Sequence, residues 1–187
     1  MRRVPVRIVP AGFIYYWILE YLQANLPKAY PVEIRIQHNP LKIPNFVYTK
    51  NSQIMSEAFL NYLRAVDNWP RDERILAVVE GDARSTGTNF VFGQAEVGGR
   101  LGAVYIVRLN PEFYGSGEND GLFLLRILKE ASHELGHILG LGHCSNLRCV
   151  MSFSNSVWEV DRKSWLPCED CRGRLLSLDA QASAEGV

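Results

Sequence analysis

The histidines and cysteines of this chain are crowded into one short stretch, and this crowding constrains the fold more than any other feature. The 187-residue chain has four of each, and seven of these eight residues lie between His133 and Cys171. Imidazoles and thiolates are the side chains that most often hold zinc in proteins. We therefore expect this stretch to fold around metal ions.

Three of the histidines follow the pattern His-Glu-x-x-His-x-x-Gly-x-x-His. On an α-helix, His133 and His137 lie one turn apart on the same face, so both imidazoles can reach one ion. The third ligand, His143, requires the helix to end first. Gly140 can end it, because glycine adopts positive φ without steric cost. Three imidazoles leave a fourth position for water, which is the arrangement of a catalytic zinc site.

Glu134 lies beside the first histidine of this pattern. We expect it to act as a general base, which takes a proton from the zinc-bound water and delivers it to a leaving amine. The alternative is that the histidines are ordinary polar residues with an accidental spacing. Five fixed positions match by chance in a chain of this length with a probability of roughly 10⁻⁵. His38 has no partner in the sequence and is expected at the surface.

The charges and the apolar segments exclude several kinds of partner. Twenty basic and twenty acidic residues give a net charge of zero, which provides no general attraction for nucleic acids or anionic membranes. The apolar run at residues 11–19 is typical of a strand followed by a helix rather than of a signal peptide. No segment approaches the ~20 apolar residues that span a bilayer. We therefore expect a cytoplasmic monomer with no nucleic-acid or membrane partner.

The four cysteines form two short pairs, Cys144 with Cys149 and Cys168 with Cys171. Four thiolates match a closed tetrahedral zinc site, which is structural because it leaves no position for water. Disulfides or unrelated buried thiols are the alternatives, but in a reducing compartment clustered cysteines favour metal binding. The sequence thus predicts two zinc ions per chain, one catalytic and one structural.

The residues before the histidine motif alternate between strand-like and helix-like segments. Strands are expected at residues 4–9, 32–37 and 74–80, with helices between them at 12–26 and 53–66, the first ended by Pro27. This alternation predicts parallel strand pairing with right-handed crossovers.

A hairpin and a long helix are expected next. Residues 89–97 and 101–109 flank a glycine-rich turn and predict two antiparallel strands. A helix capped by Asn119 or Asp120 is expected to run to about Gly140. A short helix near residues 173–180 is expected to follow.

Met151 lies eight residues after His143 and is expected in a tight turn beneath the catalytic zinc, where its thioether packs against the imidazole rings without binding the metal. Taken alone, a methionine in a loop is more often a gap filler. Here it completes a set of motifs, and the complete set resembles the metzincin clan of zinc peptidases.

The cysteines narrow this resemblance to the archaemetzincin family. Cys144 directly follows the third histidine, Cys149 lies two residues before Met151, and a cysteine pair follows downstream. The resemblance implies a metzincin-like α/β (α+β) fold: a twisted, mixed five-stranded sheet with an antiparallel edge strand, and a central active-site helix. It also implies two subdomains, an α/β part at residues 1–140 and a small, irregular, zinc-clamped part at residues 141–187.

The resemblance implies a zinc-dependent metallopeptidase that acts on a peptide or protein substrate. On the family template, residues 89–97 form the edge strand over the cleft, where an extended peptide can pair through main-chain hydrogen bonds. The candidate substrate-binding residues are Phe90, Val91, Phe92 and Gly93. Ordinary sheet packing is the simpler account of the first three side chains.

Two questions stay open in the sequence. Phe153 occupies a position where some other metzincins carry a tyrosine, so oxyanion stabilisation is left to zinc or to another donor. Glu96 and Asp82 are the candidate anchors for a free amino terminus, and nothing decides between aminopeptidase and endopeptidase action. The alternative to a peptidase is a weakly active or inactive zinc protein that binds peptides or regulates a partner.

Overall fold

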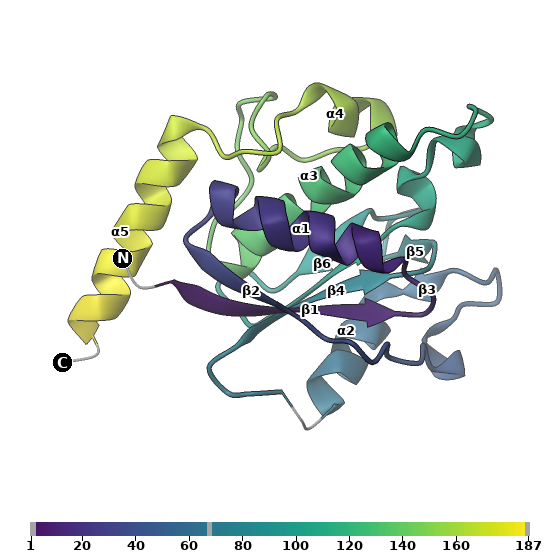
Figure 1. The fold of residues 1–187 in the computed structure, drawn as a ribbon, viewed down its shortest axis with the longest axis horizontal. Helices are drawn as coiled ribbons and strands as arrows, with labels where there is room; N and C mark the ends of the chain where they lie inside the picture. The colour runs from purple at the N-terminus through teal and green to yellow at the C-terminus, as the bar shows by residue number, and fades with distance from the viewer. Residues whose placement is uncertain (1–2, 67–68, 186–187) are drawn as a thin grey trace.

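A five-stranded mixed sheet forms the centre of the fold in the computed structural model, which describes residues 3–66 and 69–185 (Figure 1). The strand order is β2-β1-β4-β7-β6. The parallel strands are β1 (Val4–Ala11), β2 (Val32–Ile36), β4 (Arg74–Val79) and β7 (Leu101–Tyr105), and β6 (Gly93–Ala95) pairs antiparallel with β7 at one edge. The predicted mixed five-stranded sheet with an antiparallel edge strand is confirmed.

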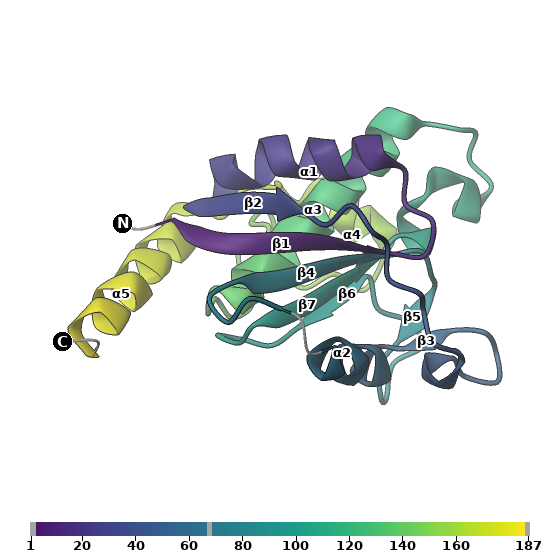
Figure 2. The ribbon, with the colours of Figure 1, turned by 60° about the horizontal axis from the view of Figure 1, so that its bottom comes forward.

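Helices cover both faces of this sheet (Figure 2). α1 (Tyr16–Ala29) and α3 (Asp120–Ile138) lie on one face, and α2 (Ser56–Ala65) lies on the other. Alternate residues of the inner parallel strands β1, β4 and β7 therefore enter two different cores. In β4, Leu76 packs in the core with α1 and α3, whereas Ile75 packs in the core with α2. Burial on both faces explains why β4 and β7 are nearly continuous apolar runs.

The long helix α3 carries the histidine motif past the sheet. Its first turn is capped by Asn119, whose side-chain oxygen accepts a hydrogen bond from the Leu122 backbone N–H at 2.9 Å. Its apolar side packs on β7 and β6, and Gly102 permits the close approach. A Cβ on Gly102 would lie 2.9 Å from Ile138 Cδ1 and 3.0 Å from Ala95 Cβ. The contact at Gly102 thus sets the distance between α3 and the sheet.

The chain after α3 is mostly irregular and ends in two helices, α4 (Val157–Arg162) and α5 (Glu169–Glu185). The first turns of α5 return to the end of α3. Leu175 is buried in the core that α1 and α3 share, and Leu178 lies against Gly140. The chain between α3 and α5 is therefore anchored to the rest of the fold at both of its ends.

Several boundaries differ from the sequence prediction. α1 continues through Pro27, because a proline in the last turn removes only one hydrogen bond from a helix that is about to end. β6 is shorter than the predicted strand because the residues before it pair elsewhere: Val91 N donates to Ala83 O at 2.8 Å. β7 ends early, and two 3-10 turns follow it, η2 (Val107–Leu109) and η3 (Pro111–Tyr114).

Other elements were not predicted or were longer than expected. They are a two-stranded sheet of β3 (Ile54–Met55) and β5 (Ala83–Arg84), the turn η1 (Asn45–Val47), helix α4, and the full length of α5. Elements of two to six residues are too short to show a period in the sequence. No helix among the described residues is both long and apolar enough to cross a membrane. The division into residues 1–140 and 141–187 stays a prediction.

The close approach at Gly102 gives a first prediction. Gly102→Ala should lower the free energy of unfolding by about 1–3 kcal/mol, because the added Cβ overpacks the contact with Ile138 and Ala95. Urea denaturation measures this change. Gly117→Ala is the control, since a Cβ at Gly117 would meet nothing within 4 Å. Equal stability of both variants would show that α3 does not depend on this contact.

Candidate active site

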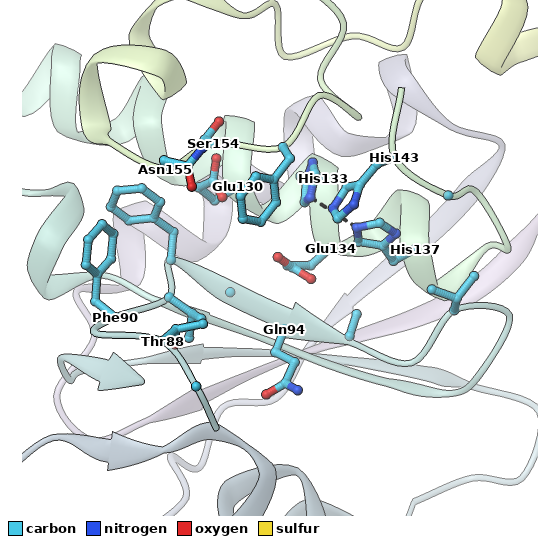
Figure 3. A pocket seen from close by; sticks show the side chains of 18 of the residues that line it. Thr88, Phe90, Gln94, Glu130, His133, Glu134, His137, His143, Ser154 and Asn155 are labelled. Carbon is cyan, nitrogen blue, oxygen red and sulfur yellow. Dashed lines mark hydrogen bonds between the residues drawn. The ribbon is translucent and has the colours of Figure 1, made fainter. Parts of the chain in front are cut away.

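A cleft of about 690 Å³ runs between the sheet edge at β6 and the helix α3 (Figure 3). Its walls are residues 87–95 on the sheet side and residues 153–155 on the other side. His133, Glu134 and His137 line it from α3, and His143 lines it from the chain that follows. The structure thus brings the three candidate histidines and the candidate base into one cleft.

Backbone carbonyls hold both helical imidazoles. His133 Nδ1 lies 2.7 Å from Val150 O, and His137 Nδ1 lies 2.7 Å from Leu141 O. A neutral imidazole that donates its Nδ1 proton to a carbonyl keeps the lone pair on Nε2 free for a metal. The two Nε2 atoms are 3.0 Å apart, and the ligand atom of His143 lies within 4.8 Å of the other two. The three nitrogens therefore converge on one point.

Gly140 ends α3 and turns the chain back towards the cleft. Its φ is 98°. Gly140 N donates to His137 O at 2.9 Å and Leu141 N donates to Gly136 O at 2.9 Å, which together form a Schellman motif. The ring of His143 then lies 4.8 Å from the ring of His137, centroid to centroid. The helix end thus provides the third imidazole.

Burial lowers the pKa of all three imidazoles. The effect is strongest at His133, whose pKa falls well below its ordinary value, and it has the same sign at His137 and His143. The positive charge of Lys163 acts in the same direction at all three. A lowered pKa keeps the rings neutral at pH 7, which is the state that binds a metal.

Glu134 lies under the sheet edge with its carboxylate towards the cleft. It is 3% exposed, and its Oε2 has no hydrogen-bond partner among the described residues. Burial and the nearby Glu130 carboxylate raise the pKa of Glu134 well above its ordinary value, while Lys163 opposes them. Gly93 makes the room, since a Cβ there would overlap Glu134 Oε1 and lie 2.6 Å from Cγ. One oxygen of this buried carboxylate thus faces the cleft without a hydrogen-bond partner among the described residues.

Met151 packs against α3 at Gly136, together with a tyrosine that the sequence did not indicate. Tyr30 Oη donates to Ser132 O at 2.9 Å and lies 3.5 Å from Met151 Sδ. A Cβ on Gly136 would overlap Met151 Sδ and lie 2.7 Å from Tyr30 Oη. Burial raises the pKa of Tyr30, so its hydroxyl stays protonated and donates. Tyr30 follows α1, and no local pattern connects it with the histidine motif.

The four cysteines meet in a second cluster. Cys144 Sγ lies 3.8 Å from Cys168 Sγ, and Cys149 Sγ lies 3.8 Å from Cys171 Sγ. A tetrahedron with metal–sulfur bonds of about 2.3 Å has edges of about 3.8 Å. A disulfide would require about 2.0 Å, and all four cysteines are free. The geometry fits four thiolates around one metal ion.

Hydrogen-bond donors surround these sulfur atoms. Cys149 Sγ accepts from Met151 N at 3.4 Å and from Cys168 N at 3.2 Å, and Arg174 Nη2 lies 3.2 Å from Cys171 Sγ. Such donors stabilise negative sulfur. Without a cation, burial raises the pKa of Cys149 and of Cys171. A divalent cation offsets the cost of burying negative thiolates, so the set of hydrogen-bond donors fits four thiolates around a metal better than four neutral thiols.

The candidate substrate residues line the sheet side of the cleft. The rings of Phe90 and Phe92 meet edge to face with centroids 5.1 Å apart. Phe92 is also buried in the core, whereas Phe90 and Val91 are half-buried. Gly93 begins the edge strand over Glu134. The phenylalanine side chains therefore pack as part of the wall, and the backbone at Gly93 is the part closest to the candidate base.

The two candidate anchors for an amino terminus already have partners. Asp82 receives two hydrogen bonds from Arg108, at 2.6 and 2.9 Å, and Glu96 pairs with Arg64. Sequence reasoning also missed Lys163, a buried lysine whose Nζ lies 2.8 Å from a carboxylate oxygen of Glu130 on α3. Its position in an irregular segment carried no signal.

Comparison with known proteins identifies the relatives of this chain. Residues 18–177 match the profile of peptidase family M54. An archaemetzincin of Methanocaldococcus jannaschii is 39% identical over 170 residues, which cover 90% of each chain. A crystal structure of an archaemetzincin from Methanopyrus kandleri has a TM-score of 0.82 at 33% identity, covering 94% of this chain and 95% of that one. Another from Archaeoglobus fulgidus, complexed with malonate, has a TM-score of 0.76 at 34% identity, covering 90% and 98%.

The fold, the converging imidazoles and these relatives define a zinc metallopeptidase. More narrowly, the chain belongs to the archaemetzincin family, peptidase family M54. The predicted family, fold class and enzyme class are confirmed.

The contact at Gly136 gives a second prediction. Gly136→Ala should lower the melting temperature and the zinc content, because its Cβ displaces Met151 and Tyr30 from α3. Gly121→Ala in the same helix is the control, since its nearest contact would be 3.6 Å away. Alanine favours a helix by up to about 1 kcal/mol over glycine, so the control should be neutral or stabilised. A stabilised Gly136→Ala with full zinc content would contradict the assigned packing.

Proposed function

We propose that His133, His137 and His143 hold the catalytic zinc and that Glu134 is the general base. The observation that carries this proposal is the unpaired, buried Glu134 carboxylate beside three converging imidazole nitrogens. Zinc bound by three imidazoles lowers the pKa of a bound water to about 7 and polarises a carbonyl group.

Glu134 moves the proton in this proposal. Its raised pKa brings it closer to the range in which a carboxyl group both accepts and releases a proton near neutral pH. It accepts a proton from the attacking water and then delivers it to the nitrogen of the leaving amine. The adjacent Gly93 has no side chain to shield the carboxylate from the substrate.

The edge strand positions the substrate in the same proposal. β6 is the last strand of the sheet, so one of its sides has no strand partner among the described residues. An extended peptide can pair with this side through main-chain hydrogen bonds. The side chains that line the cleft here are those of Phe90, Val91 and Phe92, next to Gly93. The scissile bond then lies between this strand and α3.

A second zinc is held, in our proposal, by Cys144, Cys149, Cys168 and Cys171. Four thiolates close the coordination sphere, so this ion positions the chain and takes no part in hydrolysis. It fixes the segment that contains His143 and Met151. We further propose a cytoplasmic monomer, because free clustered cysteines are typical of a reducing compartment.

One observation favours a weakly active, peptide-binding zinc protein as the second candidate. Phe153 is 57% exposed, and its ring lies 5.2 Å from that of His143, so a side chain without a hydroxyl faces the site. No lysine or arginine lines the described cleft either. Transition-state stabilisation would then rest on the metal and on backbone donors, which favours slow turnover.

Replacing the candidate base tests the catalytic role. Glu134→Gln should lower kcat for peptide hydrolysis by about 10²–10⁴-fold, because an amide cannot take the proton. Chromatography of peptide digests measures this rate, and zinc content should stay unchanged. Glu118→Gln, at an exposed loop position, is the control. Equal hydrolysis rates in wild type and Glu134→Gln would rule out Glu134 as the base. If both proteins show only the same trace rate, the second candidate, a weakly active peptide-binding zinc protein, is favoured.

Metal analysis tests the two sites separately. We expect two zinc ions per purified chain, one removed quickly by a chelator and one slowly, because the cysteine site has no open position. His143→Ala should lose the first and Cys171→Ser the second. Elemental analysis by mass spectrometry measures both. A single zinc in the wild type that His143→Ala retains would argue against a catalytic metal site.

A further inference from the structure

Buried polar atoms without hydrogen-bond partners gather in the cleft. Six side chains in the described part of the chain carry such an atom, and four of the six line the cleft. The four are Gln94, Glu134 and Ser154, and also Glu130, whose buried oxygen contacts the Lys163 ammonium but no other donor. An unpaired buried polar group costs free energy, so proteins normally pair such groups. The concentration in one place indicates that a bound substrate supplies the missing partners.

Glu130 is the charged member of this group that peptide hydrolysis does not require. It is 3% exposed and lies on α3, one turn before Glu134. Its Oε1 lies 2.8 Å from Nζ of Lys163, whose side chain is also buried. The Lys163 ammonium also donates to Ser152 O at 3.4 Å, and the other carboxylate oxygen of Glu130 accepts no hydrogen bond from the described residues. The carboxylate therefore keeps an unused acceptor.

One end of the cleft, termed the side pocket, combines aromatic side chains on one wall with the polar groups of Glu130, Ser154 and Asn155. Figure 3 shows Glu130 beside Ser154 and Asn155, on the far side of Glu134 from His137. The rings of the sheet-side wall face this part of the cleft. No lysine or arginine lines the described cleft. A side chain that enters this pocket meets apolar surface first and an acceptor at its end.

The direction of the substrate follows from the proton that Glu134 delivers. This proton goes to the leaving nitrogen, so that nitrogen lies beside Glu134. The peptide released with it continues away from the histidines, towards Glu130. Glu130 and Glu134 are four residues apart, which separates their backbone positions by about 6 Å along the helix axis. The side chain just after the cleaved bond is therefore the part of the substrate within reach of Glu130.

We propose that Glu130 determines specificity by accepting a hydrogen bond from the side chain of the residue that follows the cleaved bond. The inference rests on the proposed function, since it requires Glu134 to face the leaving nitrogen. Amide and hydroxyl side chains supply a donor without a charge. A carboxylate side chain is repelled, and a lysine gains less because Lys163 already neutralises Glu130.

Peptides that differ only at the residue after the cleaved bond test this proposal. The set carries glutamine, leucine, glutamate or lysine there, and mass spectrometry locates each cut. For the wild-type protein, kcat/KM should be about 10-fold or more higher with glutamine than with leucine or glutamate, which corresponds to one hydrogen bond to a charged group. A kcat/KM for leucine that equals or exceeds that for glutamine would overturn the proposal.

In the variant Glu130→Gln, kcat/KM should be higher for the glutamate peptide than for the glutamine peptide, the reverse of the order expected for the wild type. Lys163 would then lack its anionic partner behind residue 130, and its positive charge would attract a substrate carboxylate at this end of the cleft. A damaged fold lowers all rates alike, whereas a reversal requires contact with the substrate. Glu73→Gln is the matched control, because Glu73 is also buried and ion-paired, to Arg7 at 2.6 Å, but does not line the cleft. It should keep the wild-type order.

A second variant covers the case in which Glu130→Gln does not fold, as judged by its melting temperature. Ser154→Ala removes the other unpaired group of the pocket and should reduce the advantage of glutamine over leucine about 2- to 10-fold. An unchanged advantage would count against the assigned pocket.

The outcomes separate this inference from the proposed function. If the wild type cleaves none of the peptides, the proposed function fails and the inference falls with it. If the wild type cleaves them, Glu134→Gln does not, and the order of peptides is the same in wild type and Glu130→Gln, only the inference is overturned.

Discussion

Two hydrogen bonds from imidazole rings to backbone carbonyls hold the active site together. His133 and His137 lie on a rigid helix, while their partners Val150 and Leu141 belong to the irregular chain that follows. Each bond sets the tautomer of a ring and also ties a loop to the helix. The same contacts that direct two nitrogens into the cleft therefore hold the segment that brings in His143.

Helix α3 can carry the histidines in a buried position only because glycines at its contacts let neighbouring segments approach closely. Gly93 leaves space for the Glu134 carboxylate, Gly136 leaves space for Met151, and Gly102 lets the apolar side of α3 approach β7. A larger side chain at any of these positions would meet a neighbour that is itself packed, and packed interiors accommodate added volume poorly. Close packing on several sides keeps water from α3, and ion pairs such as Arg126 with Asp161 and Glu130 with Lys163 compensate for burying its charged groups.

The cysteine cluster and the histidine site share one stretch of chain. Cys144 directly follows His143, and its N–H donates to Met151 O at 2.9 Å. A metal held by the thiolates would order this irregular stretch without taking a position in the cleft. Such a closed site would provide rigidity and would leave the histidine site open for chemistry, a division that suits a small chain with little regular structure after α3.

Local patterns in the sequence determined the parallel strands, the helix that carries the motif, and the two sets of candidate metal-binding residues, because each depends on spacing within one segment. They did not indicate Tyr30, which contacts Met151 across 121 positions, or the pairing of Lys163 with Glu130. Only the tertiary structure decided which polar atoms stay unpaired in the cleft. Such an environment is created jointly by a sheet edge, a helix and a loop, and no spacing within a single segment encodes it.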